Sequence, residues 1–502
     1  MPSAPSSAAK FSLRANPHLY EINTWAWLEE LSAKLGKQIT LDDVPDSEWN
    51  ALKSLGFDVI WLMGVWQRST RARAIELADP TNVPTYDAAL PGWTPEDVLA
   101  SPYSVAAYVP DKRIGTWSSV DRVREKLHAR GMALFLDFVG NHTALDHPWV
   151  KEHPEYYVQG SAEDYRRELK NFFAADTSQG SRYMAFGKDP YFPPWDDVAQ
   201  LNLFDPGLIE AHIGNLREIS HHCDGVRCDM AMLQLNDVFA KTWGTYLRGA
   251  TPPNEEFWAR AHSSLPNLIL LGEVYWGLEV RMMELGFSFA YDKELYDATR
   301  DSDAGKARAR LSASLDFQNH LARFLENHDE KRCAEVFGDA RIQSPAALIG
   351  TLPGMRFYHQ GELEGRRIHL PITLRRAKEE APDPVIASTL QKVLQISNED
   401  IFHRGKWNLL PVNAEGDIPP DGIIAYEWRM DNKWKLVVVN LSGGISQGRV
   451  PLRDRVSVDR NYAVYDQIND VRYQRSGGEL HNLGLFVQRE AYQAHIFDVQ
   501  PE

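Results

Sequence analysis

Short apolar runs alternate with amphipathic stretches over the first two thirds of the chain. Most of these runs stay apolar along their length instead of alternating with polar positions, which is typical of strands buried on both faces of a parallel sheet. The candidate strands are residues 19–24, 57–65, 132–138, 224–229, 268–273, 287–292, 323–329 and 355–360.

The amphipathic stretches predict helices between most of the strands. The clearest covers residues 116–131, where apolar residues share one face, Ser118 or Ser119 can cap the start and Gly131 can end it. Strand and helix alternating over more than about 250 residues predict an α/β fold, an eight-stranded (β/α)8 TIM barrel. The other expected helices are residues 47–56 and 206–220, with three more near 235–249, 253–264 and 278–286.

Three segments break this alternation. The first residues are rich in Ser, Ala and Pro, and we expect a disordered leader over residues 1–16. Residues 142–200 are too long for a plain strand–helix connection and predict a small inserted domain after the third strand. From about residue 400, short strands and turn residues predict an all-β sandwich. The expected domains are the leader, a barrel of residues 17–141 and 201–399, the inserted domain of residues 142–200, and a sandwich of residues 400–502.

Composition limits the partners and the compartment. The 502 residues carry a formal net charge of −15, which argues against nucleic acid and anionic membrane surfaces as partners. No apolar run approaches the roughly 18 residues of a membrane span, and the first residues lack the apolar core of a secretory signal. We interpret the three cysteines as small buried hydrophobes in a reducing compartment, and we expect a cytoplasmic protein.

Polar residues interrupt or finish four of the candidate strands. The stretches are LFLDFVGNH, DGVRCDMAM, LILLGEV and FLENHDE, and three of them carry Asp229, Glu273 and Asp329. Buried strands do not need these carboxylates for folding, because an unpaired buried charge is costly. Polar groups gathered at the carboxyl ends of parallel strands are how a barrel enzyme builds its active site.

The three carboxylates suit hydrolysis of a glycosidic bond. Arg227 and Asp229 are two residues apart on one strand, so they share a face, and the Arg would keep Asp229 ionised as a nucleophile. Glu273 ends an apolar strand, and a drier setting would raise its pKa as a general acid requires. Asp329, beside His328, would stabilise charge on the sugar. The structural alternatives are a helix cap for any one Asp and a structural role for the Arg–Asp pair.

Other catalytic motifs are missing from the sequence. It has no HExxH or paired-Cys zinc pattern, no GxSxG nucleophile elbow and no phosphate-binding GxxxxGK[ST]. Tryptophans in the first half suit stacking on sugar rings, although core packing is the expected role of at least half of them. They are Trp25, Trp27, Trp61, Trp66, Trp93 and Trp117.

In this order, the segments DFVGNH, GVRCDMAM, GEV and ENHD resemble the signatures of the α-amylase family of retaining glycoside hydrolases, family 13. The resemblance covers the chain from about Leu19 to its end. It implies a barrel with an insertion after the third strand and a β-sandwich after the eighth. It also implies that Asp229 is the nucleophile, Glu273 the general acid and then base, and Asp329 the group that stabilises the transition state.

The resemblance assigns roles to five further residues. Arg227 would hold Asp229, His142 and His328 would bind hydroxyls of the sugar at the cleavage site, Asp137 would support that site, and the sugar ring would stack on Tyr103. For Tyr103, simple core packing is the alternative.

Several positions depart from the family pattern. Met232 and Leu233 stand where many amylases carry a Lys that places the next sugar and a His whose carbonyl joins a calcium site. Gln200 replaces an acidic residue of the inserted domain, and Pro102 replaces the usual Gly before Tyr103. We therefore expect no cofactor, with calcium left open because Asn141 matches a calcium-ligating Asn.

The leading hypothesis is a retaining enzyme that acts on α-glucosidic bonds of α-glucans or short α-glucosides. Its substrate would be a small-molecule or oligosaccharide α-glucoside. The departures leave glucosyl transfer or isomerisation of sucrose or trehalose type as an alternative. A non-catalytic carbohydrate-binding protein is a third hypothesis, which the presence of all three carboxylates disfavours.

Overall fold

The computed structural model describes residues 11–247 and 249–502, and its centre is a closed barrel of eight parallel strands. The strand order is β1-β15-β14-β13-β12-β11-β5-β2, so each predicted strand lies beside the one expected from the chain order. This confirms the (β/α)8 fold class. The barrel strands are β1 (His18–Asn23), β2 (Val59–Met63), β5 (Ala133–Val139), β11 (Gly225–Asp229), β12 (Ile269–Gly272), β13 (Phe289–Tyr291), β14 (Leu321–Arg323) and β15 (Met355–His359).

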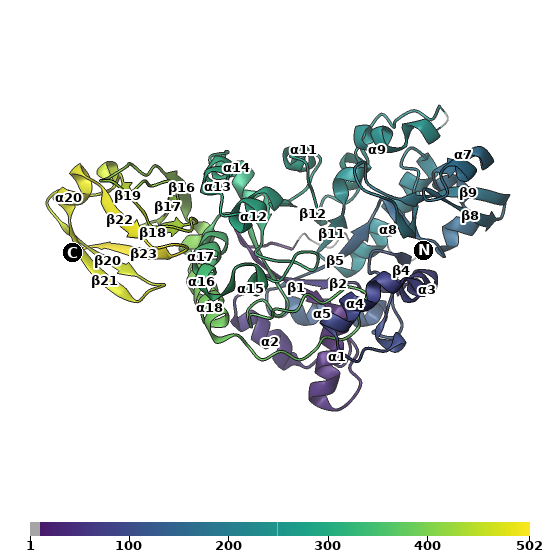
Figure 1. Cartoon of the computed structure of the whole chain (residues 1–502), viewed down its shortest axis with the longest axis horizontal. Helices are drawn as coiled ribbons and strands as arrows, with labels where there is room; N and C mark the ends of the chain where they lie inside the picture. The colour runs from purple at the N-terminus through teal and green to yellow at the C-terminus, as the bar shows by residue number, and fades with distance from the viewer. Residues whose placement is uncertain (1–10, 248) are drawn as a thin grey trace, which may run out of the picture.

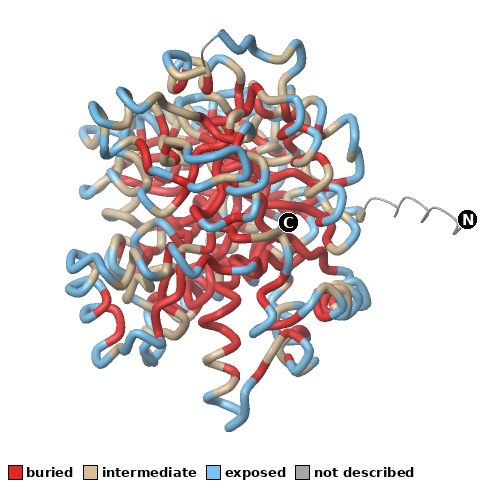
Figure 2. The backbone as a smooth tube through the Cα atoms, turned by 90° about the vertical axis from the view of Figure 1, so that its right-hand side faces the viewer, coloured by how far each residue is buried: buried red, intermediate tan, exposed pale blue. Residues whose placement is uncertain are grey.

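Helices surround the barrel (Figure 1), and the buried backbone is concentrated at its centre (Figure 2). The helices are α1 (Thr24–Leu35), α2 (Asp46–Ser54), α3 (Thr70–Ala78), α4 (Val83–Ala89), α5 (Trp117–His128), α8 (Pro206–His222), α9 (Asn236–Trp243), α10 (Phe257–Ser264), α11 (Glu279–Glu284), α12 (Lys293–Arg300), α13 (Ala304–Leu311), α14 (Leu315–Asn319), α15 (Cys333–Val336), α16 (Gly338–Arg341), α17 (Gln343–Thr351), α18 (Pro384–Ser397) and α19 (Ile401–Arg404).

Local details differ from the sequence predictions at three places. Thr116, not Ser118, caps α5, and Ser119 completes a reciprocal capping box by accepting from the Thr116 amide at 2.9 Å. The strand expected at residues 323–329 ends at Arg323, so the polar residues after it lie in a loop. The helices α12, α13 and α14, which lie between β13 and β14, fall outside the predicted helices.

The inserted segment forms its own antiparallel sheet beside the barrel. The sheet runs β6-β10-β9-β7, with β8 paired to β9, and its small apolar core includes Phe172, Met184 and Trp243 of α9. It is the blue sheet on the right of Figure 1. The elements of this segment are β6 (His142–Ala144), α6 (Pro148–Glu152), β7 (Gln159–Gly160), α7 (Ala162–Arg167), β8 (Phe172–Thr177), β9 (Gly180–Gly187) and β10 (Trp195–Gln200). A two-stranded antiparallel sheet of β3 (Trp66–Arg68) and β4 (Val105–Pro110) precedes this segment in the chain.

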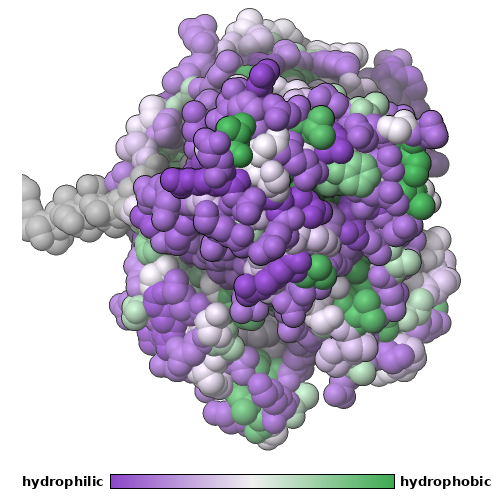
Figure 3. All heavy atoms as spheres, turned by 90° about the vertical axis from the view of Figure 1, so that its left-hand side faces the viewer, coloured by the Kyte–Doolittle hydropathy of each residue, from purple (hydrophilic) through white to green (hydrophobic). Residues whose placement is uncertain are grey.

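The C-terminal module packs a six-stranded sheet against the barrel and against a second, two-stranded sheet. Tyr426 and Trp428 both reach Thr351 of α17, at 2.7 and 2.8 Å. The surface seen from this side is mostly hydrophilic, with small separate apolar spots (Figure 3). The elements are β16 (Lys406–Leu410), β17 (Ile423–Met430), β18 (Lys433–Asn440), β19 (Ser446–Val450), β20 (Asn461–Asp466), β21 (Val471–Ser476), α20 (Gly477–Asn482), β22 (Leu485–Arg489) and β23 (Ala494–Pro501).

The expected disordered leader is wrong for residues 11–16. Phe11 and Leu13 pack against the barrel, and Arg14 donates to Asp58 at 2.7 Å, just before β2. The first ten residues of the predicted leader lie outside the described residues. The three cysteines are free and buried, as expected. In the described part of the chain, no helix combines the length and apolar character that crossing a membrane requires.

A buried ionic cluster between β13, β14 and α13 provides a test of the fold. Asp292, at the end of β13, accepts from Arg323 of β14 at 3.0 Å and from Arg310 of α13 at 2.8 Å. The Asp292 and Arg323 side chains have no exposed surface. Asp292→Asn would leave Arg323 as an uncompensated buried charge.

We therefore expect Asp292→Asn to lower the free energy of unfolding by about 3–5 kcal/mol, measured by urea denaturation. The matched control is Asp301→Asn, because Asp301 pairs with Arg300 while more than half of its side chain is exposed; its effect should be small. Similar losses in the two variants would contradict this account.

Candidate active site

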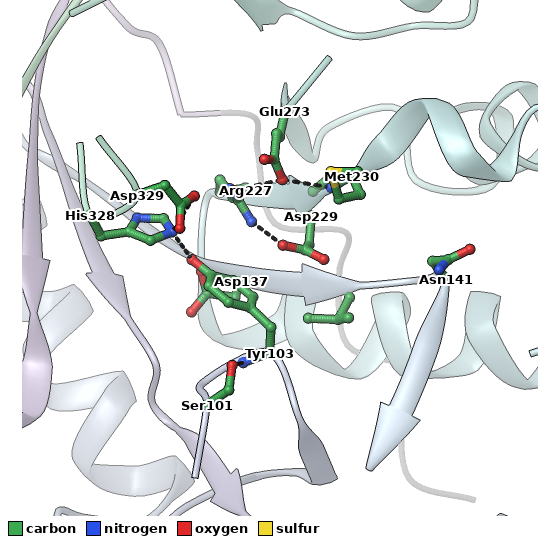
Figure 4. A network of polar contacts seen from close by, with 12 residues as sticks. Ser101, Tyr103, Asp137, Asn141, Arg227, Asp229, Met230, Glu273, His328 and Asp329 are labelled. Carbon is green, nitrogen blue, oxygen red and sulfur yellow. Dashed lines mark hydrogen bonds and ion pairs between the residues drawn. The ribbon is translucent and has the colours of Figure 1, made fainter. Parts of the chain in front are cut away.

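The residues predicted from the sequence converge at the carboxyl ends of the barrel strands (Figure 4). Asp229 ends β11, Glu273 follows β12 directly, and Asp329 lies in the loop after β14. All three line one cleft of about 480 Å³, together with Tyr103 and His142. Parallel strands all point toward the same rim, so residues remote in sequence meet there.

The three other predicted residues lie behind the cleft rather than in its lining. Arg227 and Asp137 are fully buried on β11 and β5. Asp137 accepts from the Trp61 indole at 2.9 Å and from the Gly64 amide at 2.6 Å. His328 contacts two residues that line the cleft, Tyr103 and Asp329. His328 and Arg227 therefore reach the cleft through residues that line it, and direct binding of sugar hydroxyls by His328 stays a prediction.

Arg227 joins the two carboxylates expected to perform the chemistry. Its Nη1 donates to Asp229 Oδ1 at 2.6 Å, and its Nη2 donates to Glu273 Oε2 at 2.8 Å. The guanidinium therefore bonds to both, whereas the sequence analysis expected it to serve Asp229 alone. One rigid, planar group with two parallel donors fixes the position of each carboxylate relative to the other.

Aromatic rings enclose the Arg227 guanidinium. Its central carbon lies 4.9 Å from the centre of the Tyr103 ring, 5.5 Å from that of Trp61 and 5.7 Å from that of Tyr291. The negative faces of the rings favour a cation that has lost its water. Tyr103 therefore lines the cleft and also packs on the buried arginine, and stacking of a sugar on its ring stays a prediction.

The backbone beside Asp229 is strained toward Glu273. Met230 adopts a left-handed conformation, with φ of 41°, which is unfavourable for a residue with a side chain. Its amide then donates to Glu273 Oε2 at 2.8 Å. The Tyr275 hydroxyl donates to the other oxygen, Oε1, at 2.6 Å. Three donors therefore hold Glu273 in place.

Burial raises the pKa of both Asp229 and Glu273 above their ordinary values. Arg227 opposes the rise at each carboxyl without cancelling it, and repulsion between the carboxylates adds to it. Arg227 acts on Asp229 in the expected direction, because it lowers the pKa of that carboxyl, but burial outweighs it and the net shift is upward. Two acids that interact this closely titrate as a pair.

Asp329 behaves differently because it faces a positive charge. Partial loss of water raises its pKa, but the His328 imidazolium outweighs this and brings it down to about 2. The His328 Nε2 lies 3.1 Å from Asp329 Oδ2 and 2.7 Å from the Tyr103 hydroxyl. Asp329 is thus an ionised carboxylate at the edge of the cleft, with 47% of its side chain exposed.

A further residue of the site, Glu21, was not predicted from the sequence, and its side chain contacts His328. Glu21 is fully buried on β1, and its Oε1 is 2.5 Å from His328 Nδ1. Burial lowers the pKa of His328, but Asp329 and Glu21 together raise it well above its ordinary value. Nothing in the apolar run around Glu21 marks it as part of the site, except that a carboxylate in such a run requires a partner.

His142 is a neutral member of the cleft. Burial lowers the pKa of His142 to about 4, so its ring carries no charge at neutral pH. The ring centre lies 5.4 Å from that of Trp195. No pattern in the sequence points to the remaining lining residues, which are Glu76, Ser101, Trp195, Asp197, Val198, Met230, Tyr275, Ile372 and Thr373.

The tryptophans proposed for sugar stacking do not line the cleft. Trp25, Trp27, Trp61 and Trp66 are buried in the core, where the alternative interpretation placed at least half of the set. A larger hollow of about 750 Å³ lies beside the N-terminal segment and α19, and no carboxylate lines it among the described residues. The cleft with the three carboxylates is therefore the candidate site.

Comparison with known proteins finds similarity to one family. The family model described as alpha amylase, catalytic domain, matches residues 47–191. The α-amylase MalA of Haloarcula japonica is 26% identical over 406 residues, which make up 78% of this chain and 50% of that protein. The chain is therefore similar to members of the α-amylase family over most of its length. The probable oligo-1,6-glucosidase 2 of Bacillus subtilis is 25% identical over 303 residues, 49% of this chain and 52% of that protein.

The chain spans about half the length of these curated relatives, whereas solved structures of the same fold match it almost entirely. A maltogenic α-amylase, AmyB, from Thermotoga neapolitana has a TM-score of 0.67 and 20% identity, over 96% of this chain and 98% of that chain. A trehalose-6-phosphate hydrolase from Bacillus licheniformis has a TM-score of 0.61 and 15% identity, over 97% and 99% of the two chains. Both likenesses show the shared α-amylase fold.

The buried Glu21–His328 contact provides a test with a defined pH dependence. A raised His328 pKa contributes stability that is fully present below the unfolded value of about 6.5 and disappears as pH rises through the folded value. Glu21→Gln removes one cause of the raised pKa. We expect a loss of about 1.4 kcal/mol for each unit by which that pKa falls, largest below pH about 6.5 and smaller at alkaline pH.

The measurement is urea denaturation of Glu21→Gln at several pH values between mildly acidic and alkaline. Glu125→Gln, at an exposed position on α5, is the control and should lose little at any pH. A loss for Glu21→Gln that is equal at every pH would rule out the linkage to His328.

Proposed function

We propose that the chain is a retaining glycoside hydrolase that cleaves α-glucosidic bonds through a covalent glycosyl-enzyme. The observation that carries the proposal is the convergence of Asp229, Glu273 and Asp329 on one cleft, with one guanidinium bonded to the first two. Such a bridge favours the short separation of a retaining pair, roughly 5–5.5 Å, over the wider spacing of an inverting pair. Family relatives named as amylases and glucosidases support the same class of substrate.

In the first step, an Asp229 oxygen attacks the anomeric carbon while Glu273 protonates the departing glycosidic oxygen. The bond from the anomeric carbon to that oxygen breaks, and an ester to Asp229 forms. Glu273 Oε1 is the atom suited to carry the proton, because Oε2 already accepts from Arg227 and Met230. The Tyr275 hydroxyl donates to Oε1 and so favours the ionised carboxylate that acts in the second step.

In the second step, the Glu273 carboxylate takes a proton from water, which attacks the anomeric carbon and releases Asp229. The mechanism needs Glu273 protonated and Asp229 ionised at the start. Burial raises the pKa of Glu273 and favours the first, and Arg227 lowers the pKa of Asp229 and favours the second. Asp329, with its low pKa, stays ionised throughout and would stabilise positive charge on the sugar ring. The chemistry needs no group beyond these carboxylates, so we propose that no cofactor takes part.

The cleft lining supports recognition of a sugar. The rings of Tyr103 and Trp195 present flat apolar surfaces, and His142 and Asp329 present polar groups beside them. We propose that the ring at the cleavage site stacks on Tyr103. Trp195 takes the place of the tryptophans first considered for stacking.

Glucosyl transfer uses the same carboxylates and differs only in whether water or a sugar hydroxyl meets the glycosyl-enzyme. Product analysis by NMR with maltose, sucrose, trehalose and maltooligosaccharides distinguishes hydrolysis from transfer and reports the anomer formed first. We expect the first product to retain the α-anomeric configuration, and a first product of inverted configuration would contradict the proposal. We also propose a cytoplasmic location, supported by the three free buried cysteines, and a substrate range without nucleic acid, supported by the net charge of −15.

The roles of the two central carboxylates can be separated by the leaving group. Glu273→Gln should lower cleavage of unactivated α-glucosides about 10²–10⁴-fold, and cleavage of activated aryl α-glucosides much less, because only the former need protonation. Asp229→Asn should lower both at least about 10⁴-fold. Steady-state kinetics on the two substrate types measure this.

Glu330→Gln is the matched control for these variants. Glu330 follows Asp329 in sequence, but it pairs with Lys293 at 2.9 Å and does not line the cleft. Its activity should be close to that of the wild type. Equal losses for Glu273→Gln on both substrate types would argue against Glu273 as the acid.

Tyr275 is expected to influence the pKa of Glu273. Its hydrogen bond lowers the pKa of Glu273, so Tyr275→Phe should raise that pKa. Because the acid works in its protonated form, the basic limb of the kcat/KM profile should move to higher pH. Tyr246→Phe is the control, since Tyr246 donates to Glu168 away from the cleft. A basic limb that stays in place or moves to lower pH would show that Tyr275 does not act through Glu273.

A further inference from the structure

The side-chain amide of Gln200 lies inside a cage of oxygen atoms. Gln200, the last residue of β10, is fully buried. Its Nε2 is 3.0 Å from the Asn141 backbone oxygen, 3.0 Å from Asn141 Oδ1 and 3.1 Å from the Leu201 backbone oxygen. Three acceptors therefore converge on one nitrogen that has two hydrogens to donate.

Converging oxygens of this kind are how proteins hold a hard cation. Calcium takes six to eight oxygen ligands at roughly 2.3–2.6 Å, and carboxylates usually supply part of the charge. Around Gln200 the distances are those of hydrogen bonds, and the central atom is covalently attached to the chain. Its hydrogens point at the oxygens, so a cation cannot use the same oxygens while the amide is there.

The charges of the cage also disagree with calcium. Its three oxygens are neutral, and Gln200 stands where the family resemblance implies an acidic residue. Among the described residues, no three His, Cys, Asp or Glu side chains form a group that could hold a metal. The residues present therefore do not fit the calcium ion that the resemblance left open.

We propose that the Gln200 amide replaces a structural cation and makes the junction between the inserted domain and the barrel independent of calcium. The junction is short: Asn141 is the second residue after β5, and Gln200 pairs with His142 of β6. The Leu201 amide adds a bond to the Asn141 backbone oxygen at 3.1 Å. One neutral side chain thus ties the end of β10 to the end of a barrel strand.

The same cage fixes a residue of the cleft. Asn141 Nδ2 lies 3.3 Å from Gln200 Oε1 and 3.3 Å from His142 Nδ1. The amide orientation of Asn141 therefore connects Gln200 to the His142 ring. The inference concerns the frame of the cleft and stands whether or not the chain cleaves glycosides.

The wild-type protein provides the first test. After dialysis against a chelator, elemental analysis should find much less than one calcium per chain. The midpoint of thermal unfolding should be the same in EDTA and in millimolar CaCl2. One retained calcium per chain, or a midpoint several degrees higher in calcium, would overturn the proposal.

Substitution at position 200 provides the second test. Gln200→Glu places a carboxylate against three oxygens, so in EDTA its unfolding midpoint should fall well below that of the wild type. Millimolar calcium should restore much of that loss, because a bound ion stabilises the folded state by mass action. A Gln200→Glu variant as stable as the wild type in EDTA, with no response to calcium, would overturn the proposal.

Two further variants separate the cage from general effects. Gln200→Met keeps the length of the side chain but donates to no oxygen, so its midpoint should fall and calcium should not restore it. Gln488→Glu adds the same charge at an exposed position on β22 and should respond to neither EDTA nor calcium. If Gln200→Glu does not fold even with calcium, the wild-type measurements decide alone.

Discussion

The burial of one positive charge, the Arg227 guanidinium, organises the catalytic end of the barrel. A lone cation without exposed surface would be strongly destabilising. The surroundings must therefore supply a compensating negative charge and hydrogen-bond acceptors for the guanidinium N–H groups. Asp229 and Glu273 supply the charge, and the rings of Tyr103, Trp61 and Tyr291 enclose the remaining surface. The geometry that the proposed catalysis requires is thus also the geometry that makes the buried arginine tolerable.

A second layer sets the charge state of this centre. Glu21 and Asp329 on either side keep His328 positively charged, and His328 in turn keeps Asp329 ionised. Asp137 holds the neighbouring Trp61 in place through its indole. The carboxylates of the site therefore differ in protonation because their neighbours differ, although all lie at the same end of one barrel.

The fold and the three carboxylates could be predicted because they follow from repeating physical patterns. Apolar strand runs recur with helices between them, and parallel strands bring their carboxyl ends together, so Asp229 and Glu273 had to lie close. Other members of the site leave no such pattern. Glu21 of β1 contacts His328 in the loop after β14, Tyr275 reaches the cleft from a loop, and Trp195 reaches it from the start of β10. The raised pKa of Asp229 reflects a balance of burial against charge that only three-dimensional packing determines.

The left-handed backbone at Met230 constrains how this site can change. A residue there must tolerate a positive φ so that its amide can face Glu273. Glycine and asparagine adopt that conformation readily, whereas valine, isoleucine and threonine are disfavoured by their branched side chains. The side chain also lines the cleft. Substitutions at this position that aim to change the shape of the cleft therefore have a narrow choice of residues, because the backbone conformation limits them before any ligand does.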